Sequence, residues 1–170
     1  MSGDCLDNVI LGQLPKRIIL GFVDNKAFNR DRKMNPFNFQ NYSINFLSLY
    51  VDGVQVPSKL LQPTFTGNTL MYVEAYHTLF LGTRIYYMNE GNSIHRKDYP
   101  NGYCLFAFDL TPDLSSHIAG LWTLVKNGTV RIEVRFETAL TKTINCILYA
   151  EFHNILEIDS NRQVVVDFNS

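Results

Sequence analysis

Apolar and polar residues alternate along most of this chain with a period of two, which indicates β-strands rather than helices. In the segment TVRIEVRFETAL, apolar side chains at 130, 132, 134 and 136 alternate with charged ones at 131, 133, 135 and 137. Such a pattern is typical of an antiparallel strand with one face in the core and the other in solvent. The same reasoning predicts strands in RIILGFVD, CLFAFDL and QVVVDF. The segment NCILYAEFHNILEI is apolar on both faces, so we expect it to be central in a sheet or covered by a neighbour.

Residues 42–57 predict a hairpin whose first strand is irregular. Apolar residues occupy even positions up to Phe46 and odd positions from Leu47 onward. This change of phase predicts a β-bulge or burial of both faces. Asp52-Gly53 then precedes VQV, and glycine tolerates the positive φ that a tight hairpin needs. Asn-Gly pairs at 101–102 and 127–128 predict two further turns, each just before a strand.

Two connections depart from the strand pattern. The segment TLMYVEAYHTLF has apolar residues at helical spacing and predicts a short helix inside a loop. The segment TPDLSSHIAGLWTLVKNG starts with a turn or helix-start signal and predicts an irregular excursion. We therefore predict one all-β domain over residues 1–170, in which residues 1–13 are a loosely ordered lead-in. The expected architecture is an antiparallel single jelly roll, a sandwich or barrel with long loops and one short loop helix.

Composition narrows the possible partners. The net charge of -1 gives no basic excess, so we expect no sequence-specific binding of nucleic acid. No apolar run is long enough for a transmembrane helix, and the acidic start does not resemble a signal peptide, so we expect no membrane partner and synthesis in the cytosol. Three scattered cysteines predict reduced thiols. Charged residues make up 18% and aromatic residues 13%, which fits either a β-rich core or a surface that meets another protein.

No arrangement of residues makes a case for catalysis or for a cofactor. Glu74 and His77 lie three apart on the predicted helix, as in di-iron bundles, but the second copy that such a site needs is missing. Glu151 and His153 share one face of a strand, and nothing nominates a third metal ligand. The sequence holds no G-x-S-x-G, P-loop or G-x-G-x-x-G motif. We therefore predict no enzyme, no metal site and no cofactor.

Six stretches, in their order along the chain, together resemble one protein family. They are LPKRIILGFVDNKAFN, KMNPFNFQNYSINFLSLYVDGVQVP, YVEAYHTLF, NEGNSIHRKDYPNGYCLFAFDLTPD, VRIEVRFE and YAEFHNILEIDSNRQVVVDF. This run is similar to the C-terminal half of the major capsid protein of Polinton (Maverick) elements and adintoviruses. The resemblance covers the chain from Leu14 to Phe168, and NPFNF and GYCLFAFDLTPD carry most of it.

The resemblance implies a structural role without catalytic residues. The capsid protein of this family is a double jelly roll, with two eight-stranded barrels side by side. Three chains form a capsomer, and capsomers tile a shell around double-stranded DNA. This chain would be the second barrel, and its partners would be copies of itself or a sister jelly-roll domain. It would be a virion protein made in the host cytoplasm, with assembly in the nucleus as one option.

The chain departs from the family at three points. It has one barrel, so it is an isolated domain, a truncated copy or a single-barrel derivative. Arg30 stands where a small turn residue, often glycine, is expected, and the loop after Pro112 is short or altered. A domesticated copy or a lectin-like jelly-roll binding module is therefore the alternative function. A jelly-roll enzyme of the cupin type would need an H-x-H strand, which the sequence lacks.

The candidate contact residues are aromatic. Phe37, Phe39 and Tyr42 lie in the Asn/Phe-rich segment before the predicted hairpin, and Trp122 lies in the predicted excursion. We expect these four residues to contact another copy or a sister domain. Ordinary core packing is the alternative for the first three.

Overall fold

The computed structural model describes residues 2–67, 71–83, 85, 93–111, 126–153, 156–158 and 162–166. Its strands and helices are β1 (Ser2–Gln13), β2 (Arg17–Asp24), α1 (Asn25–Phe28), β3 (Phe39–Gln40), β4 (Ile44–Val51), β5 (Val54–Leu61), α2 (Val73–Thr83), β6 (Asn101–Gly102), β7 (Leu105–Asp109), β8 (Asn127–Phe136), β9 (Ile144–Glu151), β10 (Leu156–Ile158) and β11 (Val164–Val166). The ladders between these strands are antiparallel, which confirms the predicted all-β antiparallel class. No helix within the described ranges is long and apolar enough to cross a membrane.

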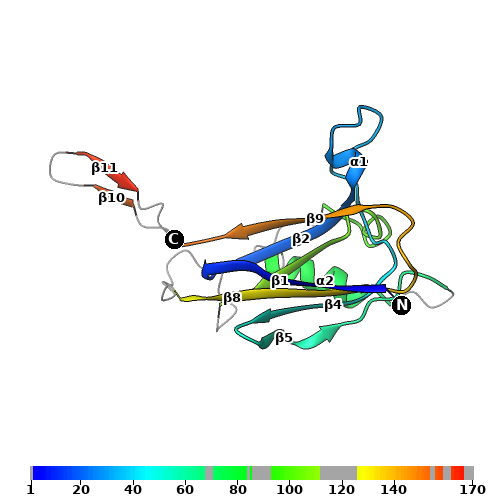
Figure 1. The fold of residues 1–170 in the computed structure, drawn as a ribbon, viewed down its shortest axis with the longest axis horizontal. Coiled ribbons are helices and arrows are strands. Elements are labelled where there is room, and N and C mark those ends of the chain that lie inside the picture. Colours follow the sequence, from blue (N-terminus) through cyan, green and yellow to red (C-terminus); the bar gives the residue numbers. More distant parts are fainter. Residues whose placement is uncertain are drawn as a thin grey trace.

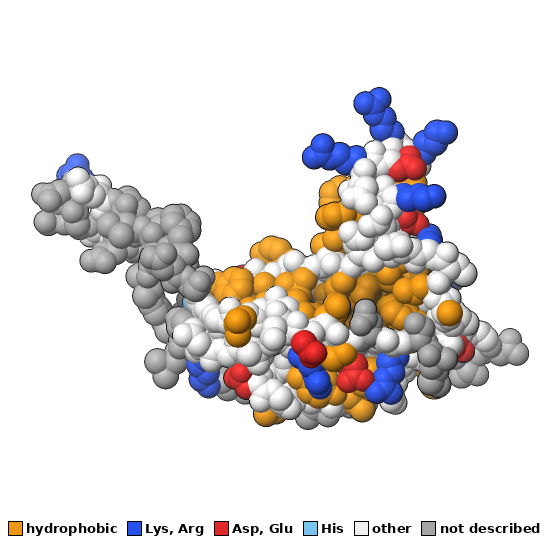
Figure 2. All heavy atoms as spheres, viewed as in Figure 1, with side chains coloured by type: hydrophobic (Ala, Val, Ile, Leu, Met, Phe, Trp, Pro, Cys, Tyr) orange, Lys and Arg blue, Asp and Glu red, His pale blue; other side chains and the backbone are white. Residues whose placement is uncertain are grey.

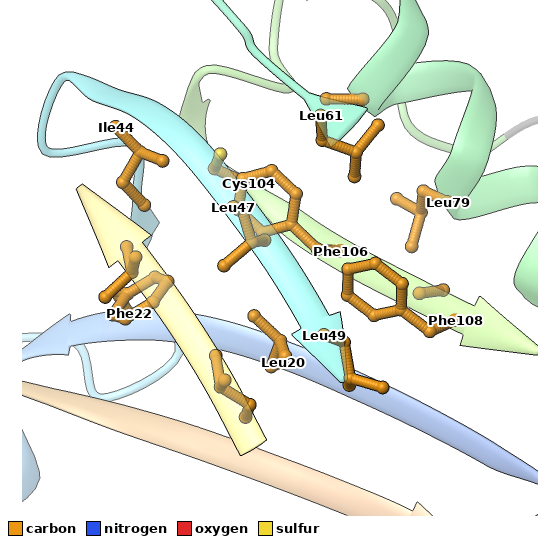
Figure 3. Packing of buried hydrophobic residues seen from close by; sticks show 14 of the residues in the cluster. Leu20, Phe22, Ile44, Leu47, Leu49, Leu61, Leu79, Cys104, Phe106 and Phe108 are labelled. Atoms are coloured by element: carbon orange, nitrogen blue, oxygen red, sulfur yellow. The ribbon is translucent and has the colours of Figure 1, made fainter. Parts of the chain in front are cut away.

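Two sheets face each other and enclose the core. One has the strand order β1-β8-β4-β5 and the other the order β7-β2-β9 (Figure 1). Side chains from β2, β4 and β7 point toward one another between the sheets (Figure 3). The rings of Phe22 and Phe136 meet edge to face across this space, with centroids 6.2 Å apart. The short pairs β3-β6 and β10-β11 lie outside these two sheets, and the second forms a hairpin that projects from them (Figure 1).

Strand β8 confirms the alternation that its sequence predicts. Its apolar positions 130, 132, 134 and 136 are buried in the core. On the opposite face, the guanidinium of Arg131 lies 4.3 Å from the ring centroid of Tyr50, and that of Arg135 lies 4.6 Å from the ring centroid of Phe46. Arg135 also forms an ion pair with Glu133, with a nitrogen–oxygen distance of 2.6 Å. Charged side chains thus cover aromatic rings on the outer face of this sheet.

Strand β4 has the predicted bulge, and the predicted hairpin follows it. The register of β4 against β8 shifts between Ile44 and Phe46, next to the point at which the apolar positions change phase. Val51 pairs with Val54, and the two turn residues have φ values of 50° for Asp52 and 79° for Gly53. Two successive positive φ values suit the twist of a two-residue hairpin, and glycine adopts them without steric cost.

Three expectations about local structure were wrong. Residues 1–13, expected as a loosely ordered lead-in, form β1, which pairs with β8 along most of its length. The Asn-Gly pairs lie in strands rather than in turns, because 101–102 is β6 and 127–128 begins β8. The segment of β9 was expected to be central or covered, yet β9 is an edge strand next to β2. In each case the segment pairs with a strand that is distant in the sequence, and local propensity does not predict such pairing.

The predicted loop helix is present as α2. Its buried residues Ala75, Leu79 and Phe80 join the core, and the helix packs along β7. Aromatic contacts hold the helix in place. The ring centroid of Tyr76 lies 4.8 Å from that of Phe80 and 5.4 Å from that of Tyr99. The predicted excursion after Thr111, including Trp122, lies outside the described residues, as does the loop after Pro112.

Replacement of Asp52 tests the hairpin. The backbone N–H of Thr129 donates a hydrogen bond of 2.8 Å to the Asp52 carboxylate, which ties the turn to β8. Asp52→Ala removes this acceptor and places alanine at a positive φ, so we expect the free energy of unfolding to fall by about 1–2 kcal/mol. Asp52→Asn keeps an acceptor oxygen and tolerates this φ, so we expect a change within about 0.5 kcal/mol. Urea denaturation measures both, and equal losses for the two variants would contradict this role of Asp52.

Candidate interaction surface

The space between the two sheets is closed on one side by α2. This helix packs along β7, and its first turn lies next to the end of β5, where Leu61 and Ala75 line a common cavity. As a result, the inward-facing residues of the β7 segment, Cys104, Phe106 and Phe108, are at most 2% exposed.

The opposite side of the two sheets is open within the described residues. There the edge strands are β1 and β9. Their inward-facing apolar residues are only half-buried, although they pack against the core. We term this surface the open seam, and its residues are Leu6, Val9, Ile10, Ile144, Cys146, Leu148 and Ala150. Hydrophobic side chains form a band across this face of the molecule, between β9 above and β1 and β8 below (Figure 2).

The two edges that border the seam differ in regularity. Strand β1 has a bulge between Leu6 and Ile10, where Asn8 has a φ of 51°, and such a bulge hinders pairing with another strand. Strand β9 pairs with β2 at each position from Ile144 to Glu151, without a register shift. No described strand pairs with the other edge of β9. A regular, apolar edge strand is a template on which another chain can add a strand.

Polar contacts hold the two edges together at one end of the seam. The side-chain amide of Gln13, at the end of β1, donates a hydrogen bond of 2.9 Å to the carbonyl of His153. Glu151 forms ion pairs with Lys16 and Arg17, with nitrogen–oxygen distances of 2.6 and 3.6 Å. Glu151 was considered as a metal ligand from the sequence. In the structure its carboxylate pairs instead with these two cationic side chains, which lie where the chain passes from β1 to β2.

The other residues with candidate chemistry are not brought together. Glu74 and His77 are both exposed on α2. The described part of the chain holds no group of three or more His, Cys, Asp or Glu side chains that could bind a metal ion.

The aromatic candidates from the sequence occupy different environments. Phe37 is 74% exposed. Phe39 is half-buried in β3 and lies so close to β2 that a Cβ on Gly21 would be 2.6 Å from its ring. Tyr42 is half-buried, with the amino group of Lys142 5.6 Å from its ring centroid, and burial raises the pKa of its hydroxyl. Trp122 lies outside the described residues. Their role in contacts stays a prediction.

Sequence reasoning did not identify the open seam. Strand β1 shows no regular alternation, and β9 is apolar on both faces, as central strands also are, so the pattern alone does not reveal an edge. One available signal was the apolar character of both faces of β9, with Ile147 and Tyr149 on the face opposite Cys146 and Leu148. Tyr149 is 59% exposed on the outer face of its sheet.

Comparison with known proteins gives one relative. The chain is 26% identical over 166 residues to the uncharacterized protein F54H12.2 of Caenorhabditis elegans, a match that covers 95% of this chain and 38% of that protein. The chain therefore spans well under half the length of the relative that it matches. No family model matches the chain. No solved structure matches it either.

The cysteines offer a test of how deeply the seam strand is packed. Burial raises the pKa of the Cys146 thiol to about 11 and that of the Cys104 thiol to about 12, whereas Cys5 is exposed. At pH 8 only about one Cys146 in a thousand is then the reactive thiolate. We expect Ellman's reagent to modify one thiol quickly at pH 8 and all three in guanidinium chloride. Cys5→Ser should abolish the fast reaction, and a second fast thiol in the native chain would contradict the packing of β9.

Proposed function

We propose that this chain is a structural domain that acts by self-assembly, a single jelly roll like that of the capsid proteins which its sequence resembles. The path of the chain supports the jelly roll. Of the connections between successive strands of the two sheets, only the β4–β5 hairpin stays within one sheet, and the others cross from one sheet to the other. Crossing connections of this kind are typical of Greek-key and jelly-roll folds. The two sheets hold seven strands within the described residues, against eight in a complete jelly roll.

The open seam is the observation that carries the proposal. It combines half-buried apolar side chains on β1 and β9 with a regular edge on β9 that no described strand pairs. Exposure of the apolar side chains costs free energy, because their surface stays in contact with water. Exposure of the strand edge has a second cost, because unrelated chains can pair with it. A partner that covers the seam removes both costs at once. Symmetric assemblies of many copies are built from such repeated contacts.

The partner under this proposal is a second copy of the chain or a sister jelly-roll domain. More than half of the length of the C. elegans relative lies outside the match, which leaves room in that protein for a further domain of this size. In a double jelly roll, the sister domain would lie beside the seam. The resulting subunit would be a capsid component of a virus-like transposable element.

The test is the size of the chain in solution. We expect size-exclusion chromatography with light scattering to show mass that increases with protein concentration, and negative-stain images to show trimers or larger assemblies. Tyr149→Lys adds a charge on the outer face of β9, beside the edge at which a second copy would pair, and should weaken association at least about tenfold, because a strand added at that edge would partly desolvate the charge. A matched control is Val54→Lys, at a position 67% exposed on β5, beyond the closed side.

Each outcome of this comparison has a definite meaning. Association that Tyr149→Lys weakens and Val54→Lys leaves unchanged supports assembly through the seam. A monomer at every concentration contradicts self-assembly of the chain alone, and favours a binding module or a domain that needs its sister. Equal effects of the two variants would show that another surface carries the contact.

A further inference from the structure

The chain between β2 and β3 forms a protrusion that carries an unusual concentration of positive charge. Residues 25–38 stand out from the two sheets at α1 (Figure 1), and we term them the basic finger. Lys26, Arg30, Arg32 and Lys33 are all exposed on it. Lys and Arg side chains spread in different directions around this protrusion (Figure 2). Asp31 is the single acidic residue of the finger, which therefore has a charge of +3, and since the whole chain has a charge of -1 the remainder has a charge of -4.

These four cations are available to a ligand. None of them forms an ion pair with a residue in the described part of the chain. The Asp31 carboxylate instead accepts a hydrogen bond of 3.0 Å from the backbone N–H of Lys33. The backbone N–H of Asp31 donates a hydrogen bond of 3.0 Å to the carbonyl of Lys26. Asp31 thus shapes the loop, and its carboxylate does not pair with the cations around it.

Arg30 provides an independent observation. Its φ is 70°, in the left-handed region that favours glycine. A non-glycine residue pays a steric cost in this conformation, and such strain persists mainly where the side chain has a use. The backbone N–H of Arg30 donates to the carbonyl of Ala27 at 3.3 Å, and no described residue forms an ion pair with its guanidinium. The backbone would favour glycine, and the residue present supplies a positive charge at the tip.

The base of the finger is held firmly against the body. Asp24 caps α1 by accepting the backbone N–H of Lys26 at 2.8 Å, and it forms an ion pair of 2.7 Å with Lys142. The hydrogen bond from Lys142 holds the pKa of the Asp24 carboxyl below its usual range. The Asn25 side chain donates to that of Asn145 at 2.8 Å, and the Asn25 backbone N–H donates to the carbonyl of Thr143 at 3.1 Å. The finger therefore presents its charges from a fixed position at the start of β9.

We propose that the basic finger binds the phosphate backbone of nucleic acid without reading its sequence. Four unpaired cations that point in different directions suit a polymer with a phosphate at every residue better than they suit one isolated anionic group. Two exposed aromatic side chains, Phe28 at 51% and Phe37 at 74%, lie on the same finger and can pack against bases or sugars. The negative charge of the remainder restricts contact with nucleic acid to the finger.

This inference does not depend on the proposed assembly function. Over the whole sequence the charges nearly cancel, and this near-neutrality argued against binding to nucleic acid. The fold separates the charges, because it extrudes one basic segment from a body of opposite sign. The proposed contact has no base specificity and agrees with the expectation that sequence-specific binding is absent.

The test measures binding of the full chain to a fluorescently labelled DNA duplex of about 20 base pairs by anisotropy, between about 0.02 and 0.2 M salt. If all four cations contact phosphates, the logarithm of the association constant should fall against the logarithm of salt concentration with a slope of about -3.6. A duplex of unrelated sequence should bind equally well. Arg30→Gly removes one contact, so we expect the slope to change by about 0.9 and the affinity at 0.1 M salt to fall about eightfold.

Arg30→Gly also separates binding from folding. Glycine relieves the backbone conformation at this position, so we expect the thermal midpoint of the variant to stay equal or to rise. A control with Lys97→Gln and Lys126→Gln removes two exposed positive charges outside the finger and should change affinity less than about twofold. Protein concentrations are chosen below any association seen by light scattering.

Four results would overturn the proposal. They are no binding of the wild-type chain at the lowest salt, equal losses in the control, an unchanged slope in Arg30→Gly, and binding to phosphatidylserine vesicles or polyglutamate as tight as to DNA. The last result would assign the finger to a membrane surface or to an acidic protein. Specific loss in Arg30→Gly with a retained thermal midpoint would support nucleic acid as the ligand.

Discussion

The contact between the apolar inner faces of the two sheets is the interaction on which the rest of the structure depends. Strand β8 shows how the contact arises, because it pairs with β1 and β4 on its two edges and turns its alternate apolar residues to the other sheet. The edge-to-face contact of Phe22 with Phe136 joins the sheets directly. Each fully buried side chain of this size contributes about 1.5–3 kcal/mol relative to leaving it in water. The sheets are stable only as a pair, because each buries its apolar face against the other.

The same contact leaves apolar core residues to be covered at the two sides where the edge strands of the sheets face each other. Wherever two sheets stack without closing into a barrel, the core reaches the surface between their edge strands. Here α2 and its aromatic neighbours cover one side, and Phe106 is fully buried there. On the other side, Leu148 and Cys146 remain half-buried between β1 and β9. This asymmetry is the physical basis of the proposed assembly, because a partner would do for the second side what α2 does for the first.

The basic finger depends on the sheets in a different way. Its base is fixed by Asp24 at the end of β2 and by Asn145 at the start of β9, two neighbouring strands of one sheet. The sheet can hold this base because β2 and β9 are paired along their whole common length. Ala27 is buried at the base of the finger, but most of the finger's other side chains are exposed, so its composition can serve a ligand. Arg30 places a positive charge at a φ of 70°, a backbone conformation that glycine adopts at lower steric cost.

The sequence by itself determined the local elements of this protein. Alternation in β8, the change of phase in β4, the Asp52-Gly53 turn and the helical spacing of α2 were all predictable, because period and backbone preference act over a few neighbouring residues. Which strands meet was decided only by the tertiary structure. Strand β1 forms because β8, far away in the sequence, offers it an edge. Strand β9 is an edge strand because, among the described strands, only β2 pairs with it. Exposure of the seam and the separation of charge onto the finger follow from these long-range pairings, and no local pattern encodes them.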